Sequence, residues 1–193
     1  MTDITAEAQF DNFFALFEQP VQFEVNQESL DQHLRLLQKR YHPDNVAKNL
    51  KNTLQAQQQS EQASALINQA YQVLSAPDSR ASYLLDMADQ AQNIEHSIAD
   101  LDFLEDAMQM RMDLDDAIEG KDRATLQQIH PQITERLAKQ SKRFNDAYQN
   151  QDWQTAIDAT QKLKFLVKLN ADVTTGIDEL ATSEHSDDDD LYV

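Results

Sequence analysis

The chain has 193 residues, with 16 Lys and Arg against 34 Asp and Glu, so its net charge is −18. Such an acidic surface repels phosphates, which excludes a typical nucleic-acid-binding protein. Two Gly and four Pro are too few for a protein rich in tight β-turns, so the composition favours helices. The absence of Cys excludes disulfides, thiolate metal sites and a Cys nucleophile.

Signals for membranes or export are not visible in the sequence. No apolar run approaches the roughly 20 residues that span a bilayer, so we expect no membrane partner. The first twenty residues carry no Lys or Arg, which argues against a signal or transit peptide. We therefore expect a cytoplasmic, helical protein.

A first helical unit is expected over residues 1–89. Its helices are predicted at 11–17, 26–42, 52–75 and 78–89. The first of these is a short segment rich in Phe, suited to plug a core. The second has a candidate N-cap in Asn26. It ends before Pro43, because a proline drives the preceding residue out of the helical region.

A second helical unit is expected over residues 98–181, after a linker. Its helices are predicted at 101–119, 121–149 and 152–180. Gly120 is the candidate C-cap of the first of them, and Pro131 is expected to kink or split the second. Residues 182–193 include four consecutive Asp and are predicted to form a disordered, solubilising tail.

The helix predicted at 101–119 carries apolar residues on more than one face. One stripe has i, i+4, i+8 spacing and consists of Leu104, Met108 and Met112. Leu101, Leu114 and Ile118 compete with it for the core-facing position, so periodicity leaves the exposure of Met108 open. Phe165 lies off the apolar stripe of its own helix and is the better candidate for a contact surface. A helix covered on several sides would nevertheless bury it too.

The tripeptide His42-Pro43-Asp44 is the sharpest local feature. It follows a helix with a basic face, and residues 33–51 hold five Lys or Arg and one Asp, a local charge of +4. A patch of this sign would steer the chain toward an acidic partner surface. Asp44, in a loop after a proline, is free to pair with a partner Arg. The alternative interpretations are a plain helix stop and an ordinary solvated face.

The context of this tripeptide resembles the J-domain family, whose members stimulate ATP hydrolysis by DnaK-class chaperones. Tyr41 precedes it, and the later sequence contains Ala70-Tyr71-x-x-Leu74, then Pro77 and Arg80-x-x-Tyr83. The resemblance implies an antiparallel helix hairpin with short flanking helices. It places the chaperone contacts on His42, Pro43, Asp44, Arg35, Lys39 and Arg40. Asn45 departs from the Lys that often follows the motif in the family.

The second unit resembles the C-terminal domain of the HscB family, the co-chaperones of iron–sulfur cluster assembly. The likeness is carried by Phe103-Leu104, residues 111–115, Arg136-Leu137, Trp153 and residues 162–169. It implies an all-α chain in which a J-domain is followed by a C-terminal three-helix bundle. It also implies two partners, the DnaK-class chaperone HscA and the cluster scaffold IscU.

The family's scaffold contacts fall, by position, on six residues of the second unit. They are Leu104, Glu105, Met108, Gln109, Met112 and Phe165. Glu105 stands where the family often has an apolar residue, and Met112 where it often has an acid. Two other hypotheses remain compatible: a J-domain co-chaperone for a different client, and an acidic helical interaction scaffold without a chaperone partner.

No catalytic or metal site is expected. The sequence offers no defensible Ser-His-Asp arrangement. The four His outside the tripeptide lack the helical spacing of metal ligands; they are His33, His96, His130 and His185. We therefore expect no enzymatic activity and no cofactor.

Overall fold

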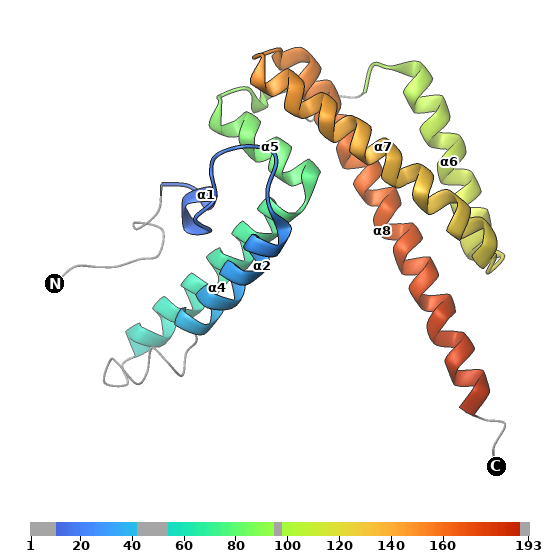
Figure 1. The fold of residues 1–193 in the computed structure, drawn as a ribbon, viewed down its shortest axis with the longest axis horizontal. Coiled ribbons are helices and arrows are strands. Elements are labelled where there is room, and N and C mark those ends of the chain that lie inside the picture. The colour runs from blue at the N-terminus through green and yellow to red at the C-terminus, as the bar shows by residue number, and fades with distance from the viewer. Residues whose placement is uncertain (1–10, 42–53, 95–97, 190–193) are drawn as a thin grey trace. The chain divides into compact units, whose positions relative to one another are not determined.

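The computed structural model of the chain describes residues 11–41, 54–94 and 98–189 (Figure 1). Within these residues the regular structure consists of helices and contains no strand, which confirms the predicted all-α class. The chain divides into two compact units, Met1–Ala88 and Asp89–Val193. No helix of the described part combines the length and the apolar composition that a membrane crossing needs.

The first unit is built on a hairpin of two long helices. In chain order it contains α1 (Phe13–Leu16), α2 (Gln27–Tyr41), α4 (Leu54–Ser75) and α5 (Pro77–Met87). Figure 1 shows α2 and α4 side by side. Gln27 at the start of α2 meets Tyr71 near the end of α4 at 3.2 Å, whereas Tyr41 at the end of α2 meets Ser60 at 2.6 Å. The hairpin is therefore antiparallel, as predicted.

Side-chain caps set where the first two helices begin. Asn26 Oδ1 accepts from the backbone N–H of Ser29 at 3.0 Å, which confirms the predicted N-cap of α2. Asn12 Oδ1 accepts from the N–H of Ala15 at 2.9 Å, so α1 begins later than predicted. The end of α2 is Tyr41, and residues 42–53 lie outside the described residues.

Arg80 and Tyr83, two residues of the family likeness, have structural roles in the first unit. The buried guanidinium of Arg80 donates to the backbone carbonyl of Leu74 at the end of α4, and lies 4.9 Å from the ring centre of Phe23. Burial lowers the pKa of Arg80 to about 10, so the group remains a cation at neutral pH. The hydroxyl of Tyr83 accepts from the backbone N–H of Phe13 at 3.0 Å, which attaches α1 to α5.

The second unit is the predicted three-helix bundle. Its helices are α6 (Leu101–Glu119), α7 (Arg123–Gln149) and α8 (Trp153–Asp189), and a short 3-10 helix, η2 (Ala91–Asn93), precedes them. Helices α7 and α8 lie along one another, and α6 packs against them (Figure 1). Their shared core consists of Met110, Leu114, Ala117, Leu126, Ile129, Ile133, Leu169 and Val173.

The helices of the second unit depart from the prediction in detail. Helix α7 is not split at Pro131, which lies exposed inside a continuous helix and removes a single backbone hydrogen bond. Helix α8 continues to Asp189, past its predicted end at residue 180, since no Gly or Pro after Gly176 ends the helix. Gly120 caps α6 as predicted, but Lys121 takes the left-handed conformation, with φ of 52°.

Candidate partner-binding surfaces

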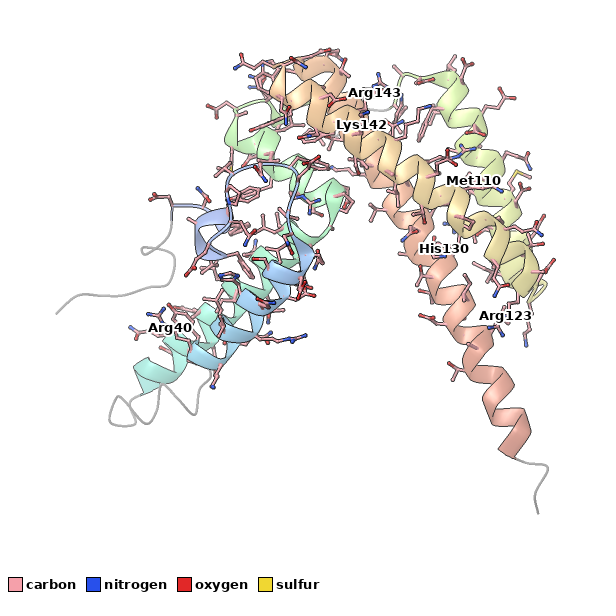
Figure 2. The ribbon with its side chains drawn as sticks, viewed as in Figure 1. Arg40, Met110, Arg123, His130, Lys142 and Arg143 are labelled. Carbon is pink, nitrogen blue, oxygen red and sulfur yellow. The ribbon has the colours of Figure 1, made fainter. Side chains whose placement is uncertain are left out.

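The second half of α2 carries an exposed basic face. Arg35, Lys39 and Arg40 are exposed, whereas Leu37 of the same helix is turned to the core. Figure 2 labels Arg40 in the last turn, where its guanidinium carbon lies 5.6 Å from the ring centre of Tyr41. Half of the predicted chaperone contacts therefore lie on the solvent side of one helix. The other half, at 42–44, lies outside the described residues.

Hydrogen bonds to α4 fix the end of α2, from which the predicted chaperone-binding segment departs. Ser60, which is almost fully buried, donates from Oγ to the carbonyl of Tyr41 at 2.6 Å. Farther along the hairpin, Tyr71 Oη donates to Asp31 Oδ1 at 2.8 Å. That hydrogen bond raises the pKa of Tyr71, which keeps the phenol protonated. The basic face is thus presented on a helix held at both ends.

The predicted scaffold contacts on α6 are mostly exposed. Met108 and Met112 are 63% and 59% exposed, Glu105 and Gln109 are exposed, and Leu104 is half-buried. The spacing of Leu104, Met108 and Met112 places them on one side of α6. The methionines therefore belong to the surface rather than to the core.

Other residues turn α6 toward the core. They are Ala107, Met110, Leu114 and Ala117. Leu101 is 75% exposed, so the prediction that it competes for the core is wrong: it lies in the first turn, outside the arc of the core residues. Leu101, Met108 and Met112 have i, i+7, i+11 spacing and form an exposed apolar stripe, called the methionine stripe below.

Phe165 of α8 is half-buried, as expected for a helix packed on several sides. It packs against the core of the second unit. Its ring meets that of Phe103 edge-on, with ring centres 6.2 Å apart and planes at 80°. Phe165 therefore joins α8 to the start of α6 through Phe103.

Acidic side chains surround the methionine stripe. Helix α6 carries Asp102, Glu105, Asp106, Asp113, Asp115, Asp116 and Glu119 against a single cation, Arg111. Arg111 donates from Nε to Asp115 at 3.0 Å and from Nη1 to Asp172 of α8, and these hydrogen bonds raise its pKa. The charge of Arg111 is therefore paired with carboxylates of the second unit. The remaining surface is apolar and acidic, which suits an apolar partner face bordered by cations.

The sequence pattern assigned no role to Lys162 of α8. Its side chain is 2% exposed, and its ammonium lies 2.7 Å from Asp100 and 2.9 Å from Asp158. The i, i+4 spacing of Asp158 and Lys162 inside an apolar stripe is the signal that could have identified this pair. Asp100, the other partner of Lys162, lies 62 residues away in the chain, so no local sequence spacing indicates this contact.

Two known domain families match most of the chain. A DnaJ domain matches residues 20–83, and the HSCB C-terminal oligomerisation domain matches residues 99–174. The first match falls within the first compact unit and the second match within the second.

Curated relatives and solved structures are similar over nearly their whole length. Co-chaperone protein HscB homolog from Acinetobacter baumannii (strain SDF) is 34% identical over 177 residues, which cover 92% of this chain and 96% of the relative. The homolog from Acinetobacter baylyi is 32% identical over 181 residues, 94% and 99% of the two chains. The chaperone HscB from Vibrio cholerae has a TM-score of 0.70 at 32% identity, covering 88% of this chain and 99% of its own. Human co-chaperone protein HscB shares the fold: it is 22% identical with a TM-score of 0.68, and the match covers 86% of this chain and 85% of the human one.

Proposed function

The chain belongs to the HscB family of J-domain co-chaperones, and from this membership we propose that it acts in iron–sulfur cluster assembly in the cytoplasm. The first unit binds the DnaK-class chaperone HscA and stimulates its ATP hydrolysis, and the second unit holds the scaffold IscU. The observation that carries the proposal is the pairing, in one chain, of a J-domain that exposes a basic helix face with an HscB-type bundle that exposes a methionine stripe.

The chaperone contact uses the tripeptide at 42–44 together with the basic face of α2. Cations on an exposed face of an acidic chain steer association toward an acidic surface over about 10 Å at 0.1 M salt. Pro43 restricts the turn that presents its neighbours. The carboxylate of Asp44 can accept two parallel hydrogen bonds from a partner Arg, which adds geometric specificity.

The scaffold contact centres on Met108 and Met112, with Leu104 and Phe165 beside them and Glu105 and Gln109 at the polar rim. Methionine is flexible and polarizable, so it adapts to the shape of a partner. Burial of exposed apolar area contributes about 25 cal/mol per Å². The acidic groups of α6 favour a scaffold face that surrounds its apolar centre with Lys or Arg.

The chain itself performs no chemistry on the cluster in this proposal. It holds client and chaperone on one polypeptide, so that the second binding event resembles an intramolecular one. ATP hydrolysis takes place in the chaperone, and the J-domain promotes it.

Steady-state ATP hydrolysis by HscA, measured with and without IscU, tests this function. The wild-type chain is expected to raise the rate, and His42→Gln to abolish the stimulation while the fold and IscU binding are kept. His130→Gln, the same change on α7 outside both contact sets (labelled in Figure 2), is the control and should stimulate like wild type. Full stimulation by His42→Gln would contradict the docking role. Stimulation without IscU binding would indicate a different client.

A further inference from the structure

The buried cation Lys162 connects α8 to the start of α6. Its ammonium donates to Asp100 Oδ2 at 2.7 Å and to Asp158 Oδ2 at 2.9 Å, and only 2% of the side chain is exposed. Asp158 also lies 3.1 Å from Arg143 of α7, which is labelled in Figure 2. A buried charge is costly unless it is paired and hydrogen-bonded, and the two carboxylates meet this need.

Asp100 both binds Lys162 and caps the first turn of α6. Its Oδ1 accepts from the backbone N–H of Phe103 at 3.0 Å and caps the helix, while its Oδ2 accepts from Lys162. The hydrogen bond from Lys162 is the main reason why the pKa of Asp100 lies below its usual value. Both oxygens are committed, so the start of α6 is fixed by its own cap and by α8 together.

Ring contacts extend the connection to the scaffold surface. The ammonium of Lys162 lies 5.3 Å from the ring centre of Phe103, within cation–π range, and Phe103 meets Phe165 edge-on at 6.2 Å. Leu104 follows Phe103 in the chain. Lys162 therefore contacts the chain neighbour of one predicted scaffold contact, Leu104, and this neighbour packs against another, Phe165.

An ionic connection defines position more closely than an apolar one. The hydrophobic effect is non-directional, whereas hydrogen bonds at 2.7 and 2.9 Å specify both distance and direction. Arg111 makes a further ionic contact from α6 to Asp172 of α8. Lys162 holds the end of α6 at which the methionine stripe begins.

We propose that Lys162 is a positioning residue of the scaffold-binding surface. Through Asp100 and Phe103 it sets the start of α6 against α8, so that Leu104 and the methionine stripe form one face with Phe165. The inference rests on the proposed function, because it names a residue that serves IscU binding from inside the bundle.

Three variants separate positioning from folding. Lys162→Met keeps an unbranched side chain in the buried position and removes its charge, while Asp158 retains Arg143. Asp100→Asn keeps the helix cap, since Asn caps about as well as Asp, but removes the ion pair. Lys168→Met changes an exposed lysine of the same helix and is the matched control.

Calorimetric titration with IscU is expected to show affinity about tenfold weaker for Lys162→Met and for Asp100→Asn, and unchanged for Lys168→Met. The double variant should lose about as much as either single one, because both changes remove the same connection. Helix content and Tm of Lys162→Met should stay close to wild type, because neither carboxylate is left buried without a partner: Asp158 keeps Arg143, and the side chain of Asp100 is 42% exposed. Hydrogen exchange at the amides of 101–104 should become faster.

Wild-type affinity in Lys162→Met, or losses that simply add in the double variant, would overturn the positioning role. An affinity loss that only follows a loss of helix content would overturn it as well. If the wild-type chain fails to bind IscU, the proposed function fails. The hydrogen-exchange comparison then still determines whether Lys162 holds the start of α6.

Discussion

The exposed methionines 108 and 112 define the kind of surface that α6 offers. A single exposed apolar side chain is ordinary on a soluble protein, whereas three lie on one face of α6. Leu101 lengthens this patch toward the helix start, where Lys162 and Asp100 hold the backbone. The apolar surface therefore begins at a fixed point of the bundle.

Met108→Ala is expected to weaken IscU binding without a loss of stability. Truncation of an exposed side chain changes the free energy of unfolding by about 0.5 kcal/mol or less, whereas loss of a central interface contact costs about 1–2 kcal/mol of binding, roughly tenfold in affinity. Calorimetric titration and thermal unfolding measure the two quantities. Met87→Ala, an exposed methionine of the first unit, should change neither. A lowered Tm with unchanged affinity would assign Met108 to the core instead.

Residue patterns predicted which side chains share a helix face, but not which face is buried. Helix α6 has apolar residues around much of its circumference, so Leu101 was assigned to the wrong side and the exposure of Met108 stayed open. Lys162 is the converse case, because a cation in an apolar stripe is ordinarily turned to water. Its burial depends on Asp100, and no local spacing encodes a partner 62 residues away.

Helix boundaries followed from the sequence to within about two residues, except at the end of α8. Asn26 caps α2 as predicted because its short side chain reaches the N–H of Ser29 within one turn. The end of α8 was predicted too early, since a run of like charges is typical of disorder whereas the helix meets no Gly or Pro between Gly176 and Asp189. A cap depends on a few neighbouring residues, whereas the length of a helix depends on the sequence along all of it and on its packing against other helices.

The N-caps of the second unit should make its stability sensitive to acid. Hydrogen bonds from the hydroxyl and backbone N–H of Thr125 lower the pKa of Asp122, and those of Thr155 lower the pKa of Asp152. Because the folded pKa is below the unfolded value of about 4, the stabilisation is complete above that value and is lost as pH falls through the folded pKa. The Tm should therefore fall as pH drops below about 4.

Asp122→Asn with Asp152→Asn should flatten this fall, because Asn caps a helix without titrating. Calorimetric scans between pH 7 and pH 3 measure the slope, and the Tm at pH 7 should stay near wild type. Asp122→Ala, which removes the cap itself, should lower the Tm at pH 7 too. An unchanged pH profile in the double Asn variant would contradict the role of the caps.

Two non-glycine residues, one after α6 and one after α7, have a left-handed backbone conformation, and a substitution by Gly could relieve its strain. Lys121 and Gln151 have φ of 52° and 58°, a region in which Cβ meets the backbone. Lys121→Gly is expected to raise the free energy of unfolding by about 0.5–1 kcal/mol, as measured by urea titration. Lys142→Gly, in the exposed interior of α7, should lower it by about 1 kcal/mol. Equal effects of the two changes would contradict the conformational explanation.

Across the whole molecule, the net charge of −18 conceals regions of opposite sign. Residues 33–51 carry +4, whereas residues 97–119 hold eight acids and one Arg. The basic face of α2 and the methionine stripe of α6 consequently differ in both charge and apolarity. Partners of different chemistry can therefore be distinguished by one chain.

Salt is expected to weaken the two partner contacts unequally. Screening slows association through the basic face of α2, whereas burial of the methionine stripe depends less on ionic strength. Stopped-flow association with HscA should slow markedly between about 0.05 and about 0.5 M NaCl, while IscU affinity changes less. Arg35→Ala should reduce both the association rate with HscA and its salt dependence. Equal salt sensitivity of the two contacts would contradict this division.

Because Ser60 holds the carbonyl of Tyr41, the hairpin itself fixes where the connection 42–53 leaves α2. Ser60 is almost fully buried, so water cannot readily replace its hydroxyl, and Ser60→Ala would leave the Tyr41 carbonyl without this partner. The last turn of α2 would then fray first, and the cations that it carries would lose their fixed direction.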